Sequence, residues 1–77
     1  MNELIEILED IKPGVDYENC ETLIDDNIFQ SLDIISLIAE LEDEYDITIP
    51  TVEIVPDNFN SAEKIMNLVN KLIEEDQ

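Results

Sequence analysis

Histidine is absent from this 77-residue sequence, and cysteine occurs once, at Cys20. Without histidine there is no base that could activate a serine or cysteine nucleophile, so the sequence indicates a protein that is not an enzyme and has no catalytic residues. A single cysteine cannot form an intramolecular disulfide, which agrees with a reducing compartment. We interpret Cys20 as a small filler side chain.

Basic residues are also scarce, because three lysines face 21 acidic residues and the formal net charge is −18. This sign excludes ordinary binding to a nucleic-acid backbone and disfavours anionic membrane surfaces. The charge predicts partners with basic patches, whose attraction weakens as salt rises. Solubility alone is the simpler interpretation of the same charge.

No apolar run approaches the roughly 18 residues that a membrane-spanning helix requires. Met1 leads directly into an amphipathic segment, without the basic stretch and the apolar run of a signal peptide. We therefore expect neither a signal peptide nor membrane insertion, and a cytoplasmic location. Glycine occurs once and proline three times in a chain that is 44% hydrophobic, a mixture that favours packed helices over a sheet.

The order of the segments predicts one all-α domain over residues 1–77, a small bundle of three longer helices and one short helix. The expected helices cover about 2–12, 31–45, 51–55 and 61–74, with a long first loop over 13–30. Residues 46–50 form an extended link, and residues 57–59 a turn. Asn60-Ser61-Ala62-Glu63 has the spacing of a capping box at the start of the last helix.

Apolar residues at helical spacing predict which side chains reach the core. In the helix over 31–45 we assign Ile35, Leu37, Ile38, Leu41 and Tyr45 to the core, and Leu32 and Ala39 to a solvent-facing flank. A loop as long as 13–30 is unusual in a compact domain and generally has a task. Its apolar side chains are expected to hold it across the bundle; they are Val15, Tyr17, Leu23, Ile24, Ile28 and Phe29.

Ser31 stands at the predicted start of the second long helix. Free backbone N–H groups and the positive end of the helix dipole favour a phosphate at such a position. A hydroxyl presented there on an acidic surface suits the attachment of a phosphate-linked group. We therefore interpret Ser31 as an attachment point.

The residues around Ser31 resemble the signature of acyl and peptidyl carrier proteins, including the D-alanyl type. The family pattern has an apolar residue, then Asp-Ser-Leu, then a helix that ends in an aromatic residue and an Ile-x-Ile-Pro link. This sequence has Phe29-Gln30-Ser31-Leu32 and, further on, Tyr45-Asp46-Ile47-Thr48-Ile49-Pro50. The segment from Ile54 to Ser61 is more similar to D-alanyl and stand-alone aminoacyl carriers than to fatty-acid carriers.

The resemblance implies a right-handed four-helix bundle and a covalent cofactor. A phosphopantetheinyl transferase would move 4′-phosphopantetheine from coenzyme A onto Ser31, and the thiol of the arm would hold an acyl or aminoacyl thioester. A loading ligase and downstream acyl-processing enzymes with basic patches would be the partners of a monomeric carrier. The positions that match the family's docking surface are Leu32, Asp33, Ala39 and Glu40.

Two residues depart from the family pattern. Gln30 stands where the family has Asp, and because Gln is a poor, neutral cap, its presence is expected to cost the helix end about 1 kcal/mol. It also bears on recognition by the transferase. Ser36 stands where the family commonly has an acidic residue, one turn into the helix. It lowers the negative charge that would face a partner.

Two functions therefore stay open on sequence grounds. The first is a carrier with a phosphopantetheine arm on Ser31; the second is an acidic docking or regulatory module with a carrier-like fold and no arm. No metal site is expected, because Asp25-Asp26-Asn27 lacks the alternating ligands, the central glycine and the closing glutamate of a calcium loop.

Overall fold

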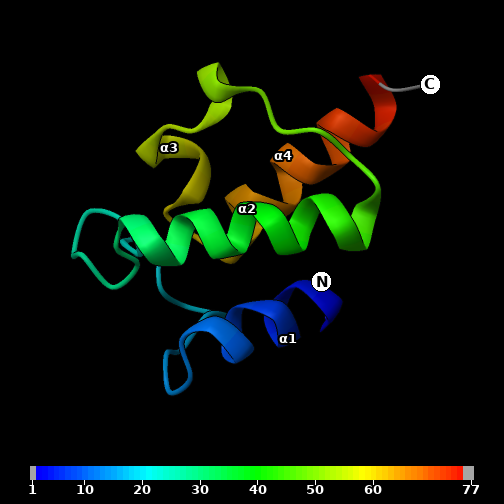
Figure 1. The fold of residues 1–77 in the computed structure, drawn as a ribbon. Coiled ribbons are helices and arrows are strands. Elements are labelled where there is room, and N and C mark those ends of the chain that lie inside the picture. Colours follow the sequence, from blue (N-terminus) through cyan, green and yellow to red (C-terminus); the bar gives the residue numbers. More distant parts are fainter. Residues whose placement is uncertain (1, 76–77) are drawn as a thin grey trace.

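The computed structural model describes residues 2–75, and within this range the chain is helical with no strand. Figure 1 shows helices α1 (Asn2–Ile11), α2 (Ser31–Tyr45), α3 (Pro56–Phe59) and α4 (Ala62–Glu75), with a single 3-10 turn, η1 (Thr51–Glu53), before α3. The all-α fold class and the small carrier-like helical bundle are confirmed. None of the helices in residues 2–75 is long and apolar enough to cross a membrane.

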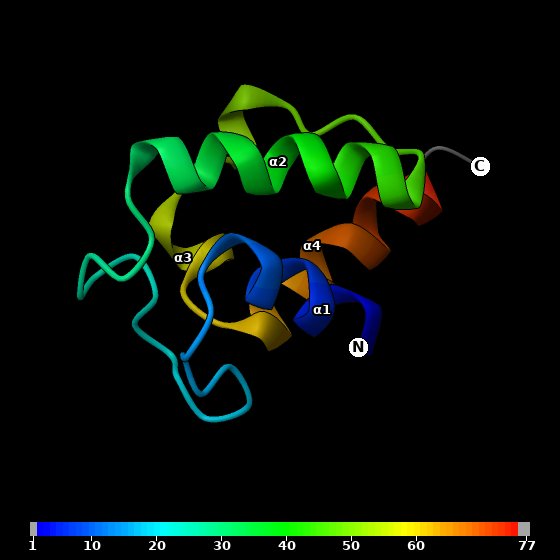
Figure 2. The ribbon, with the colours of Figure 1, turned by 60° about the horizontal axis from the view of Figure 1, so that its bottom comes forward.

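Helix α2 lies across the molecule and packs on both α1 and α4, as the two ribbon views agree (Figures 1 and 2). The core between these helices includes Leu4, Leu8, Leu41, Ile65 and Val69, all fully buried. Burial of such side chains is the main source of stability in a domain of this size.

The core side of α2 differs from the sequence prediction at Ile35. This side chain is 63% exposed, whereas Ile34 packs against the core. The buried stripe of α2 starts one residue earlier than predicted, and its members are Ile34, Leu37, Ile38, Leu41 and Tyr45. These residues keep the i, i+3, i+4, i+7 spacing of one helix face, from which Ile35 is rotated away.

The segment after α2 also differs from the prediction of one short helix over 51–55. The 3-10 turn η1 ends at Glu53, and Pro56 does not stop a helix but begins α3. Proline suits the first helical position because its missing N–H has no helical acceptor there. Residues 57–59, expected as a turn, belong to α3, and Phe59 is buried as its apolar anchor.

The long first loop is fixed to the core by its apolar side chains, as the sequence predicted. Tyr17, Leu23 and Phe29 are buried, and the rings of Tyr17 and Phe29 meet edge to face with centroids 6.1 Å apart. The Tyr17 hydroxyl donates to the Leu8 carbonyl at 3.1 Å and also contacts the Lys12 carbonyl. At the start of the loop Gly14 has φ +87°, a left-handed conformation that glycine adopts without strain. The loop therefore leads in a fixed path from α1 to Ser31.

Candidate functional site

Ser31 is the first residue of α2 and is exposed. The first backbone N–H groups of a helix have no intrahelical acceptor, and the helix dipole adds positive character at this end. An accessible hydroxyl at such a position fits a phosphodiester attached at Ser31 Oγ. No neighbouring side chain seals the residue, so a modifying enzyme can reach it.

The start of α2 forms a capping box between Gln30 at the N-cap and Asp33 at the third helical position. Asp33 Oδ2 accepts the backbone N–H of Gln30 at 3.1 Å, and the Gln30 carbonyl accepts the Ile34 N–H at 2.9 Å. Lys12 Nζ lies 3.1 Å from the same Asp33 oxygen, so the end of α1 is tied to the start of α2. The Gln30 N–H, with help from Lys12, lowers the pKa of the Asp33 carboxyl below its ordinary value.

Three apolar side chains share the exposed face of α2 beside Ser31: Leu32, Ile35 and Ala39. Leu32 is 78% exposed, and Ala39 is also exposed. We call these three residues the apolar strip. Of the four docking positions taken from the family, Leu32 and Ala39 lie in the strip, Glu40 is exposed on its flank, and Asp33 is turned toward Lys12.

A second exposed apolar group lies on η1 and the residues after it. Val52 is 81% exposed, and Ile54 and Val55 are partly exposed. Contacts with α4 and α3 hold this segment in place. Glu53 Oε2 lies 2.6 Å from Lys71 Nζ on α4, and Asn58 Nδ2 on α3 donates to the Glu53 carbonyl at 2.7 Å. The sequence prediction did not include these residues in a site.

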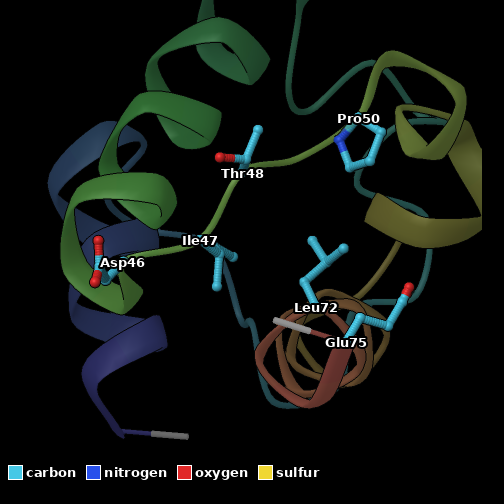
Figure 3. Close-up of a pocket in the computed structure, with 6 residues that line it drawn as sticks. All are labelled: Asp46, Ile47, Thr48, Pro50, Leu72 and Glu75. Carbon is cyan, nitrogen blue, oxygen red and sulfur yellow. The ribbon is translucent and has the colours of Figure 1, made fainter. Parts of the chain in front are cut away.

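Two cavities bear on what the molecule can hold. One, of about 400 Å³, lies at the far end of α2 from Ser31, where Ile47 and Leu72 point toward each other between Asp46 and Glu75 (Figure 3). The other, of about 150 Å³, is apolar and includes Ile34, one turn after Ser31; its remaining lining residues are Ile24, Ile54, Val55, Pro56 and Phe59.

For two residues that shape the site, the sequence predicted a different role from the one in the structure. Ile35 was assigned to the core, although Ile34 fits the buried stripe better and thereby leaves Ile35 beside Leu32 on the exposed face. Asn60 stands at the first position of a capping-box pattern, but Ser61 Oγ accepts the Lys64 N–H at 3.1 Å and caps α4 instead. The Asn60 side chain bonds to the loop before Ser31.

No family model matches the chain, but curated proteins do. It is 35% identical over 65 residues to the D-alanyl carrier protein of Streptococcus mutans, covering 84% of this chain and 77% of that protein. It is 37% identical over 71 residues to the D-alanyl carrier protein of Streptococcus sanguinis, covering 91% and 90%. The Streptococcus gordonii protein of the same name is 36% identical over 75 residues, with the same coverage. The chain therefore belongs to the family of D-alanyl-type carrier proteins.

Proposed function

We propose that this protein is a non-catalytic carrier that holds a thioester-linked aminoacyl group on a 4′-phosphopantetheine arm attached to Ser31. The observation that carries the proposal is the exposed Ser31 hydroxyl at the first position of α2, in a chain that belongs to a carrier family. When bound, the arm supplies the thiol that forms the thioester.

In the modification step, Ser31 Oγ attacks the phosphorus of coenzyme A that bears pantetheine. A new P–O bond forms, the pyrophosphate bond breaks, the hydroxyl proton leaves, and adenosine 3′,5′-bisphosphate is released. The transferase supplies the base, because the chain has no histidine. The N–H groups at the exposed N-terminus of α2 would stabilise the phosphodiester once it is attached.

D-alanine is the cargo that the relatives' names favour. A loading ligase and an enzyme that accepts the loaded carrier are then the partners. The apolar strip and Glu40 form the surface that we propose for docking, with the charge of −18 attracting basic patches.

The direct test treats the unmodified protein with coenzyme A and a broad-specificity phosphopantetheinyl transferase and weighs the intact product. We expect one phosphopantetheine on the wild type and on Ser36→Ala, and none on Ser31→Ala. Ser36 is the matched control because it is also exposed on α2. An adduct that persists in Ser31→Ala, or no adduct on the wild type, would contradict the proposal.

Loading separates the possible cargoes. The modified protein is incubated with ATP, a D-alanine-carrier ligase, and either D-alanine, L-alanine or a long-chain fatty acid with its own ligase. We expect a hydroxylamine-sensitive adduct with D-alanine. An adduct formed only with the fatty acid would overturn the aminoacyl assignment and leave the arm on Ser31 intact.

The alternative is an acidic docking module that carries no arm. Gln30 favours it, because the family has Asp before the serine. This alternative predicts that Ser31→Ala leaves the set of captured partners unchanged and that protein from its own cells carries no adduct. Loss of captured partners in Ser31→Ala, or an adduct on protein from its own cells, would exclude the alternative.

A further inference from the structure

The amide of Asn60 is buried between α3 and α4, and each of its polar atoms bonds to the loop before α2. Asn60 is 4% exposed. Its Oδ1 accepts the backbone N–H groups of Ile24 at 3.0 Å and Asp25 at 3.1 Å, and its Nδ2 donates to Asp25 Oδ2 at 3.2 Å. Its carbonyl accepts the Leu23 N–H at 3.0 Å. One residue thus holds three consecutive loop residues.

The orientation of this amide is fixed by its partners. Backbone N–H groups can only donate, and an ionised carboxylate can only accept. The oxygen of Asn60 must therefore face Ile24 and Asp25 N–H, and its nitrogen must face the Asp25 carboxylate. Capping of α4 does not use the amide, because Ser61 Oγ performs it. The Asn60 side chain serves the loop.

The residues held by Asn60 are linked to Ser31 through the turn that ends at Phe29. The Leu23 carbonyl accepts the Phe29 N–H at 2.9 Å, which closes residues 23–29 into a compact turn. The turn is braced by Thr22 Oγ1, which donates to Asp26 Oδ2 at 2.6 Å. Phe29 is buried, and Ser31 follows two residues later. Figure 2 shows this loop leading into the start of α2 near α3.

We propose that Asn60 is a positioning residue for the modification of Ser31, an inference that rests on the proposed function. By holding Leu23, Ile24 and Asp25, it fixes the turn that delivers the serine hydroxyl to the transferase. None of the hydrogen bonds of Asn60 reaches the apolar strip, because they all go to Leu23, Ile24 and Asp25. Loss of the clamp should therefore lower the rate of the bound complex more than it weakens docking.

The test exchanges the donor and the acceptor of the Asn60–Asp25 pair. Asn60→Asp keeps oxygens for the two N–H groups but sets a second carboxylate against Asp25. Asp25→Asn keeps an acceptor for the Asn60 Nδ2. The double variant Asn60→Asp/Asp25→Asn restores one donor and one acceptor in reversed positions, at the net charge of the wild type. Asn58→Asp is the matched control, because it adds the same charge to α3 without touching the loop.

Two measurements are made on each variant well below its melting temperature: kcat and KM for transfer of phosphopantetheine from coenzyme A, and amide exchange at Ile24 and Asp25. We expect Asn60→Asp to lower kcat about tenfold, because a small misplacement of the attacking hydroxyl slows an oriented reaction, with little change in KM and faster exchange at both amides. The double variant should recover both, and Asn58→Asp should change neither.

Each outcome decides the inference. Wild-type kcat in Asn60→Asp despite faster exchange, or no recovery in the double variant, would overturn the positioning role and leave the proposed function standing. No modification of the wild type would overturn both. If Asn60→Asp does not fold, Asn60→Ser, which removes the amide without adding charge, decides by the same two measurements.

Discussion

At the scale of single residues, the start of α2 shows how Asp33 supports a helix end that begins with a poor N-cap residue. Gln30 is a poor N-cap, and its presence before Ser31 predicts a weakened helix end. In the structure Asp33, three residues later, reaches back to the Gln30 N–H, and Lys12 binds the same oxygen. Gln30 and Asp33 thereby form a capping box, in which Asp33 stands at the third helical position. Asp33 is thus a structural residue as well as a candidate for docking.

The pKa of Asp33 gives the first prediction. Because its folded-state pKa lies below the ordinary value of 3.8, its ionised form stabilises the fold above that pH, and this contribution is lost as pH falls through the folded pKa. We expect Asp33→Asn to have a lower melting temperature than the wild type near neutral pH. The difference should shrink in acid, whatever the other carboxylates do to both proteins. A difference independent of pH would contradict the pairing.

The exposure of Ile35 gives the second prediction. Ile35→Ser should change the free energy of unfolding by less than about 0.5 kcal/mol, as surface substitutions do. Leu41→Ala, on the buried side of the same helix, should cost about 2–5 kcal/mol. Urea unfolding of the two variants makes the comparison. A large loss in Ile35→Ser would return Ile35 to the core.

At the scale of elements, periodicity and local chemistry explain what could be predicted. The three longer helices follow from apolar spacing, and the buried loop residues follow from their apolar side chains. The choice between Ile34 and Ile35 could have been made from the sequence, because Ile34 has apolar residues at i+3, i+4 and i+7 and Ile35 does not. The split into η1 and α3 follows from Pro56, which suits the first position of a helix. The ion pair between Glu53 and Lys71 joins residues distant in sequence and could not be predicted. The Asn60 clamp was hidden for the same reason.

Tyr17 gives a prediction for the first loop. Burial, followed by the charge of Glu9, raises its pKa from 10.0 to about 12. The neutral phenol therefore stabilises the fold below pH 10, and this contribution is lost as pH rises from 10 to about 12. In a Tyr45→Phe background, where Tyr17 is the remaining tyrosine, its absorbance should show that it ionises at a higher pH in the folded protein than in the unfolded protein. Ionisation at the ordinary pKa would mean that the loop is open.

At the scale of the whole molecule, the charge of −18 dominates. Two of the three lysines are used within the fold, Lys12 with Asp33 and Lys71 with Glu53, so most acidic side chains repel one another across the surface. This repulsion lowers stability while it keeps the protein attractive to basic partners. Composition alone predicts this balance, but which lysine meets which carboxylate depends on the fold.

Relief of the repulsion is testable with a divalent ion. We expect millimolar magnesium to raise the melting temperature relative to sodium at matched ionic strength, because a divalent ion neutralises neighbouring carboxylates more effectively. Identical melting curves would show that self-repulsion does not limit stability.

The cytoplasmic location and the monomeric state stay predictions from the sequence.

The central claim, that Ser31 carries a swinging thiol arm, is tested most directly by the intact mass of the protein purified from its own cells. The account predicts a mass increased by one phosphopantetheine, with or without a cargo released by hydroxylamine, and the unmodified mass for Ser31→Ala expressed in the same way. A wild-type protein that is wholly unmodified, under conditions in which another carrier in those cells is modified, would contradict it.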